Sequence, residues 1–309
     1  LRSLAARWVV FALTSLSAGC GPVQKAPYVS LGQREEKGDR PLSAGHKLPL
    51  RLGVAAIMSP QASFRPYRDL AQYVAAKLGR EAQLLQRPTY GEVNDLVRHG
   101  YCDFAFVCDY AYVLGRRQFG MTVLALPEVR GTTEYYSYLV VPARSPARGL
   151  RDLRGAVFAF ADPLSHTGWL VPTYQLLQLH ETPERFFHDT FFAYSHDRCI
   201  KAVAQRLADG AAVDSLVYDA MVEGDPSLAD RTRVIAQWGP YGIPPVVNHP
   251  RMPSGLRREV LATLVTMDRE EEGRRILSAL RVDRFVAPSG ERYAAVERMA
   301  KAVEEARSP

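Results

Sequence analysis

The chain has 309 residues, of which 47% are hydrophobic and 23% are charged, and its formal net charge is +6. This length allows two lobes but not an array of domains, and the composition is that of a globular protein rather than a disordered one. The arginines are scattered and do not alternate with aromatics on one helix face, which argues against a nucleic-acid-binding protein and leaves a weak preference for anionic ligands.

The first twenty residues have the layout of a secretory signal. Arg2 and Arg7 precede an apolar run, which is followed by small residues that end at Cys20. The segment is too short for a stable membrane span. Its ending, LSAGC, resembles the lipobox of bacterial lipoproteins, which implies that Cys20 is lipid-modified and anchors an extracytoplasmic protein. The alternatives are an ordinary signal peptide or a buried helix with a chance cysteine.

Residues 21–47 are polar and contain a cluster of charges at 34–40. They hold too little apolar surface to fold, so we expect a flexible tether. No later stretch is long and apolar enough to cross a bilayer, so the lipid is the only membrane attachment that we expect.

The remaining cysteines are Cys102, Cys108 and Cys199. An odd number cannot all pair internally, and Cys102 and Cys108 flank a predicted strand that holds them too far apart for a disulfide. No Cys or His spacing fits zinc, so we predict no metal site and no cofactor. We expect buried or unused thiols.

The folded body is expected to begin near Leu48 and to alternate strands with helices. Its first part predicts strands near 51–56, 82–86 and 103–107, and helices at 66–79 and 91–100. Pro66 at the first turn and Gly79 at the end favour the bounds of the first helix. This alternation indicates a mostly parallel sheet with helices on both faces.

The same alternation returns after Leu150. The predicted elements are strands at 156–160, 191–194 and 211–213 and helices at 168–179, at 197–207 and from Ser215. The tail supplies a strand at 244–248 and three helical stretches, and we expect it to pack back on the first unit.

The predicted fold is therefore α/β with two lobes and a ligand cleft between them. Residues 48–133 and 240–309 form the first lobe, residues 134–239 form the second, and the connections near Glu134 and Gly239 form the hinge.

The segment DPLSHTGWLVP, at 162–172, is the main candidate for a ligand site. It follows a predicted strand and opens a helix, where open α/β sheets hold their ligands. The free N–H groups of the first helical turn, the hydroxyls of Ser165 and Thr167 and a ring nitrogen of His166 suit a tetrahedral oxyanion. The alternative is that Ser165 or Thr167 only caps the helix.

Three further segments place polar side chains at strand ends or helix starts. They contribute His196 after a second-lobe strand, Tyr135 at the crossover, and Tyr90 at a helix start in the first lobe. A lone histidine or tyrosine is more often a packed side chain than a ligand contact, but together these segments favour one binding site.

The order of these segments resembles the PhnD-like family, the phosphate-, phosphite- and phosphonate-binding proteins of ABC transporters. The resemblance rests on residues 53–60, 89–93, 101–113, 162–172 and 242–247. It implies the type II periplasmic-binding-protein fold, a small phosphorus oxyanion as ligand, and an ABC permease as partner. A sensor kinase is an alternative partner for the same fold.

The resemblance also implies roles for single residues. Ser165 and Thr167 match a Ser-Thr-Ser-Gly-like run that grips phosphoryl oxygens, whereas His166 departs from it. Tyr90, Tyr135 and His196 match aromatic and histidine positions around the anion. Asp214 lies near the part of the pocket that holds the ligand's substituent. No carboxylate stands at 216, so an aminophosphonate is not favoured.

A hydrolase that uses Ser165 and His166, with Asp162 nearby, is the less favoured alternative. No GxSxG, P-loop or HExxH motif is present, so we expect a binding protein rather than an enzyme. The expected mechanism is capture by lobe closure, in which Tyr90 seals the site. If His196 were doubly protonated, binding would weaken as pH rises through its titration.

Overall fold

The computed structural model describes residues 48–290 and 292–307. The predicted signal segment, the lipidated Cys20 and the tether at 21–47 lie outside these residues. None of the helices within the described ranges is long and apolar enough to cross a membrane.

The first lobe is built on a six-stranded sheet with the strand order β11-β4-β10-β3-β1-β2. Its strands are β1 (Leu50–Ala55), β2 (Ala82–Arg87), β3 (Phe104–Phe106), β4 (Thr122–Glu128), β10 (Val246–Asn248) and β11 (Arg284–Val286). Its helices are α1 (Pro60–Lys77), α2 (Tyr90–Arg98), α3 (Asp109–Phe119), α9 (Ser254–Thr266) and α10 (Glu271–Leu280), with a 3₁₀ turn at Met267–Arg269.

The second lobe is built on a five-stranded sheet with the order β7-β6-β8-β5-β9. Its strands are β5 (Glu134–Pro142), β6 (Val157–Phe160), β7 (Asp189–Phe192), β8 (Gly210–Asp214) and β9 (Thr232–Gly242). Its helices are α4 (Val171–Leu177), α5 (Pro183–Phe186), α6 (His196–Ala204), α7 (Ser215–Gly224) and α8 (Ser227–Arg231), with a 3₁₀ turn at Leu150–Leu153 and a π-helical turn at His166–Leu170.

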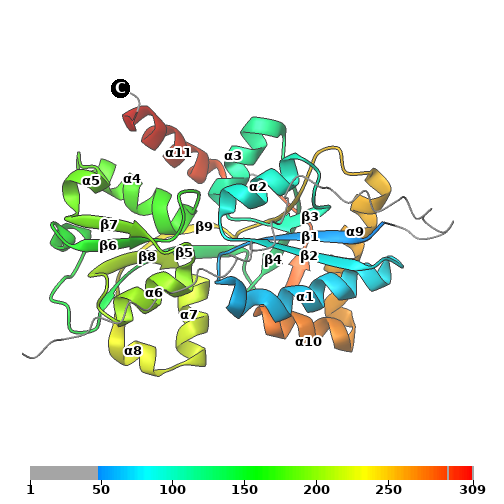
Figure 1. The fold of residues 1–309 in the computed structure, drawn as a ribbon, viewed down its shortest axis with the longest axis horizontal. Helices are drawn as coiled ribbons and strands as arrows, with labels where there is room; N and C mark the ends of the chain where they lie inside the picture. Colours follow the sequence, from blue (N-terminus) through cyan, green and yellow to red (C-terminus); the bar gives the residue numbers. More distant parts are fainter. Residues whose placement is uncertain (1–47, 291, 308–309) are drawn as a thin grey trace, which may run out of the picture. The chain divides into compact units, whose positions relative to one another are not determined.

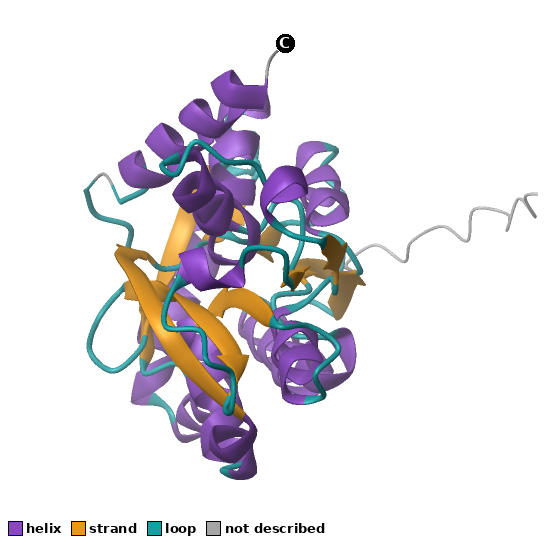
Figure 2. Ribbon diagram, turned by 90° about the vertical axis from the view of Figure 1, so that its left-hand side faces the viewer, coloured by secondary structure: helices purple, strands orange, loops and turns teal. Residues whose placement is uncertain are grey.

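The two-lobed α/β fold is confirmed (Figure 1), and Figure 2 shows helices on either side of the strands. Most strands of each sheet run in one direction, as predicted, and each sheet also has antiparallel strands. In the first lobe, β10 and β11 are antiparallel to their neighbours because they belong to the segment that returns from the second lobe. In the second lobe, β5 alone opposes the direction of the others. The alternating pattern predicted the parallel strands but carries no information on the direction of a returning segment.

Helix α1 begins at Pro60, six residues before the predicted start, and Pro66 lies inside it. Both prolines suit a first helical turn, so the local sequence did not distinguish them. A tertiary contact favours the earlier start, because the N–H of Ser59 donates to Oδ1 of Asp197 in the second lobe at 2.8 Å.

The C-terminal helix α11 (Ala294–Arg307) was expected to pack on the first lobe alone. It packs on both α3 of the first lobe and α4 of the second (Figure 1). The guanidinium of Arg307 lies 5.3 Å from the ring centre of Trp169, which extends this contact by a cation–π interaction. The return segment therefore joins the lobes rather than only completing the first.

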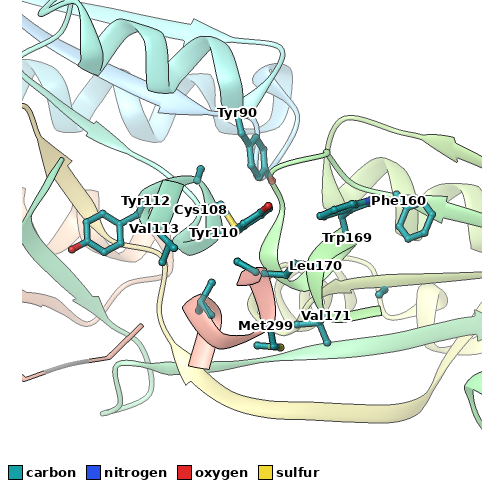
Figure 3. Close-up of a cluster of buried hydrophobic side chains, with 14 of the residues drawn as sticks. Tyr90, Cys108, Tyr110, Tyr112, Val113, Phe160, Trp169, Leu170, Val171 and Met299 are labelled. Atoms are coloured by element: carbon teal, nitrogen blue, oxygen red, sulfur yellow. The ribbon is translucent and has the colours of Figure 1, made fainter. Parts of the chain in front are cut away.

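The largest cluster of buried apolar side chains is shared by the two lobes. Figure 3 shows Tyr90, Cys108 and Tyr110 of the first lobe facing Trp169 and Leu170 of the second. Each lobe also has an apolar cluster of its own on its other side. The polar groups described below therefore lie in a water-poor environment at the junction of the lobes.

Gly273 tests the packing of the first lobe. A Cβ at this position would overlap the carbonyl oxygen of Met267, so Gly273→Ala should lower the free energy of unfolding by about 1–3 kcal/mol. Gly255, also in a helix, has open space around the position of a Cβ, so Gly255→Ala should leave stability unchanged or raise it by about 0.4–1 kcal/mol. Chemical denaturation of both variants measures the difference, and equal stabilities would contradict the packing.

Candidate functional site

The turn after β6 is held by the carboxylate of Asp162. Its Oδ1 accepts the N–H of Leu164 at 2.8 Å, and its Oδ2 accepts the N–H of Tyr90 at 3.2 Å. The second bond crosses from one lobe to the other and fixes the start of α2 above the turn. Burial raises the pKa of Asp162, and the two N–H bonds oppose that shift.

Ser165 caps the helical segment that follows. Its Oγ accepts the N–H of Gly168 at 3.0 Å, so Ser165 does cap the helix, and its own hydroxyl hydrogen is not used in that bond. The segment begins with a π-helical turn and continues as α4. Gly168 is required by close packing, because a Cβ there would lie 2.5 Å from Cβ of Ala161 and 2.9 Å from Cε1 of His196.

His196 is a neutral bridge rather than a cation. Its Nδ1 accepts the N–H of Asp214 at 3.1 Å, so the ring hydrogen is on Nε2, which lies 3.3 Å from Oγ of Ser165. The hydroxyl of Ser165 thus accepts two hydrogen bonds and keeps its own hydrogen for a third partner. Burial lowers the pKa of His196 to about 4, against the opposing charges of Asp197 and Asp109. The pH dependence expected from a protonated His196 is therefore wrong.

A buried group that the sequence analysis did not identify lies beneath this turn. The carboxylate of Asp109, at the start of α3, is fully buried. Its Oδ2 lies 2.6 Å from Nδ1 of His166, and its Oδ1 accepts the hydroxyl of Tyr135 at 2.7 Å and the thiol of Cys108 at 3.2 Å. The same thiol sulfur accepts the N–H of His166, so Cys108 is not unused. Asp109 thus connects the first lobe to the turn of the second.

Several polar atoms around the turn are buried without a hydrogen-bond partner. They are the hydroxyls of Tyr90 and Thr167 and Nε2 of His166. A buried group left in this state costs about 1–3 kcal/mol. In Figure 3 the ring of Tyr90 points from α2 toward this part of the second lobe. Burial, followed by the charges of Cys108 and Asp162, raises the pKa of Tyr90 well above its ordinary value, so the phenol keeps its hydrogen and can donate it.

His196 and Asp197 tie the start of α6 to the first lobe, whereas Ser195 does not. The N–H of His196 donates to the carbonyl oxygen of Ile57 at 3.0 Å, beside the bond between Ser59 and Asp197. The hydroxyl of Ser195 has no partner in hydrogen-bonding geometry, although it lies near enough to Asp197 to help lower that carboxyl's pKa against the effect of burial. The start of α6 is therefore a contact between lobes rather than a side-chain cap.

Asp214 ends β8 and caps α7. Its Oδ1 accepts the N–H groups of Leu216 and Val217 at 2.7 and 3.3 Å. Burial raises the pKa of this carboxyl to about 7, although those two bonds act in the opposite direction. Oδ1 of the carboxylate is thus engaged by the helix.

A cleft of about 700 Å³ adjoins the site from the side of α1 and α7. Tyr90 and the turn at 165–167 do not line the cleft. The cleft borders the site through the residues of its inner wall. That wall includes Ala55, Ile57, Val107, Asp214 and Leu216. At the mouth, Arg130 of the first lobe pairs with Asp219 and Glu223 on α7, and Arg281 pairs with Glu223.

The structure brings most of the predicted site residues together. His196 bonds to both Ser165 and the N–H of Asp214, and Tyr135 bonds to His166. Tyr90 contacts the turn through Asp162. No group of three or more His, Cys, Asp or Glu side chains among the described residues is arranged to hold a metal ion.

Asp214 gives a test of the site's electrostatics. Because its pKa is raised on folding, the carboxyl stabilises the protein below its unfolded pKa, and this contribution is lost as pH rises to about 7. Asn caps a helix as well as Asp does. Asp214→Asn should therefore melt at a higher temperature than the unaltered protein at a pH of about 8 and lose that advantage at a pH of about 4. Thermal unfolding across this range measures the effect, and a constant difference would contradict it.

Comparison with known proteins identifies the family of the chain. Residues 52–293 match the family described as "ABC transporter, phosphonate, periplasmic substrate-binding protein". A relative from Mycolicibacterium smegmatis, named phosphate-import protein PhnD, is 28% identical over 199 residues, which are 60% of this chain and 62% of that protein.

Solved structures show the same fold. A binding-protein component of an ABC phosphonate transporter from Pseudomonas aeruginosa superposes with a TM-score of 0.78 at 18% identity, covering 84% of this chain and 87% of the other. PhnD1 from Prochlorococcus marinus, in complex with methylphosphonate, gives a TM-score of 0.74 at 19% identity, covering 84% and 99%. Because the family match extends over most of the described residues, the chain belongs to the periplasmic substrate-binding proteins of phosphonate ABC transporters.

Proposed function

We propose that this protein captures a small phosphorus oxyanion between its lobes and delivers it to an ABC permease. We place it outside the cytoplasm, anchored by lipid on Cys20. The observation that carries the proposal is the group of unpartnered polar atoms at the junction of the lobes, at Tyr90, His166 and Thr167. A bound oxyanion would accept from the two hydroxyls and could share a hydrogen with Nε2 of His166.

The donors come from both lobes. The second lobe offers the hydroxyls of Ser165 and Thr167. The first lobe offers the hydroxyl of Tyr90. A ligand that first binds the turn therefore completes its hydrogen bonds only when Tyr90 approaches, so closure and binding are one event.

The relatives support a phosphorus oxyanion. One is named for phosphate import, and another was solved with methylphosphonate. The carboxylate of Asp214 is buried and its Oδ1 caps α7, and no carboxylate stands at position 216. This supports phosphate, phosphite or a simple phosphonate over an aminophosphonate.

The geometry gives little support to a hydrolase. A serine nucleophile needs a base that can accept its hydrogen. Nε2 of His196, the nitrogen nearest Ser165, already carries the ring hydrogen because Nδ1 accepts the N–H of Asp214. His166 could act as a base through Nε2, because its Nδ1 faces Asp109. However, no hydroxyl lies within hydrogen-bonding distance of Nε2.

A ligand screen tests the proposal. Thermal shift and calorimetric titration with phosphate, phosphite, methylphosphonate, aminoethylphosphonate and sulfate should show stabilisation by at least one of the first three. A protein that responds to none of the phosphorus compounds would contradict the proposed function.

Two substitutions test the donors. Thr167→Ala and Tyr90→Phe should each weaken binding by about 1.5–3 kcal/mol, roughly 10- to 150-fold, because each removes a hydrogen bond to a charged group. Both should leave the stability of the ligand-free protein unchanged or higher, because the hydroxyls have no partner there. Calorimetric titration and thermal unfolding measure the two effects.

The control is Thr173→Ala, which removes another buried, unpartnered hydroxyl from the same helical segment. It should leave affinity unchanged. Ser165→Ala should weaken binding as well, but it also removes the cap of Gly168 and costs about 0.5–2 kcal/mol of stability. Unchanged affinity in Thr167→Ala and Tyr90→Phe would place the ligand elsewhere.

A further inference from the structure

The pair formed by Asp109 and His166 sets the chemistry of one wall of the site. Both side chains are fully buried, and Oδ2 of Asp109 lies 2.6 Å from Nδ1 of His166. Tyr135 and Cys108 both donate to the other carboxylate oxygen. A carboxylate that accepts from three neighbours acts only as an acceptor, so the hydrogen of this contact is on Nδ1 of His166.

This arrangement makes the opposite ring nitrogen, Nε2, a hydrogen-bond acceptor. With Nδ1 protonated, Nε2 of a neutral His166 presents a lone pair, and Nε2 is the atom that is buried without a partner. An oxyanion cannot donate to this lone pair unless it carries a hydrogen. Otherwise the ring must first take up a proton from solvent.

The other groups around His166 do not change this conclusion. Tyr241 packs edge-on against the ring at 4.4 Å, and burial raises its pKa to about 12, so it stays neutral. Tyr135 donates to Asp109, and Cys108 accepts the backbone N–H of His166. The hydrogen-bond partners of His166 and Asp109 include no lysine or arginine.

We propose that Nε2 of His166 shares one hydrogen with a ligand oxygen, and that Asp109 enforces this by holding the other hydrogen on Nδ1. The site then selects oxyanions that carry an exchangeable hydrogen near neutral pH over fully deprotonated ones of the same shape. Phosphate monoesters, with a second pKa of about 6, represent the first class, which includes phosphate and phosphonates. Sulfate and sulfonates represent the second. This inference rests on the proposed function and specifies its ligand class.

The selection does not depend on where the shared hydrogen resides. A monoanion that donates to neutral His166 and a dianion that accepts from a protonated ring contain the same atoms and the same charge. A sulfonate can reach an equivalent contact only by taking an additional proton from solvent. The hydroxyl donors of Ser165, Thr167 and Tyr90 serve both ligand classes equally, so they do not discriminate between them.

The test compares methylphosphonate with methanesulfonate, and phosphate with sulfate, by calorimetric titration at a pH of about 7.5. The unaltered protein should bind each phosphorus compound about 10- to 100-fold more tightly than its sulfur analogue, the ratio expected when a buried acceptor is left unpaired. Titration in two buffers of different ionisation enthalpy should show proton uptake when the bound ligand enters as the dianion. Equal affinities within each pair would overturn the inference.

Two variants isolate the pair. In Asp109→Asn, the hydroxyl of Tyr135 donates to the amide oxygen, so the amide nitrogen faces Nδ1 of His166 and moves the ring hydrogen to Nε2. The sulfur analogues should then bind more tightly, and the ratio of phosphorus-compound affinity to sulfur-analogue affinity should fall at least about tenfold. His166→Thr offers a rotatable hydroxyl that donates to either class, and it should narrow the ratio and abolish proton uptake. Thr173→Ala should keep both.

The outcomes separate the two proposals. If no phosphorus compound binds, the proposed function fails. If phosphonates bind but His166→Thr keeps the original ratio and proton uptake, the inference fails and the proposed function stands. A loss of folding in Asp109→Asn leaves the comparison to His166→Thr and to the unaltered protein.

Discussion

The structure depends on the burial of polar atoms at the junction of two lobes. Three of the contacts across that junction use a backbone N–H: Asp162 with the N–H of Tyr90, Asp197 with the N–H of Ser59, and the carbonyl of Ile57 with the N–H of His196. Side-chain pairs add to them, among them Asp109 with His166 and Arg130 with Asp219. The hydroxyls of Tyr90 and Thr167 and Nε2 of His166 are left unpaired. Under the proposed function, a ligand with several polar contacts would remove the desolvation cost of these atoms, which would couple closure to binding.

The buried carboxylates Asp162 and Asp214 are stabilised by backbone N–H groups rather than by basic side chains in direct contact. Burial raises the pKa of Asp162 and of Asp214, and both carboxylates are held by backbone N–H groups that oppose the shift. His196 is neutral because its Nδ1 is committed to a backbone N–H. Under the proposed function, the hydroxyls of Ser165, Thr167 and Tyr90 would bind an anion as neutral donors, through direction and number rather than through a counter-ion.

The sequence predicted the fold and the main turn because both depend on local signals. Alternating apolar and helical segments marked the strands that lead to the site, and the hydroxyls of Ser165 and Thr167 stood after one of them, where a helix starts. The direction of β10 and the earlier start of α1 depend on contacts with distant segments, so they were not predicted. The position of His196 was predicted, but its protonation was not, because the protonation depends on the backbone N–H of Asp214.

Asp109 was missed for a related reason. It lies in an apolar and aromatic stretch that the sequence analysis treated only as part of a family resemblance, and its partner His166 is 57 positions away. The signal that was available is the order of elements, because Asp109 directly follows β3 and opens α3 just as Ser165 follows β6.

The buried carboxylate of Asp109 and the histidine at position 166, where the family resemblance implies a hydroxyl, depend on each other. A buried carboxylate next to an anion site would repel the ligand, and the desolvation of that carboxylate would add to the cost. The ring of His166 accommodates this carboxylate, because Nδ1 donates to it while Nε2 has no partner in the protein and, under the proposal, faces the ligand. A hydroxyl at position 166, as the family resemblance leads one to expect, would not reach both partners in this way. The two residues therefore act as one unit, and a change at either one alone alters what the wall of the site can recognise.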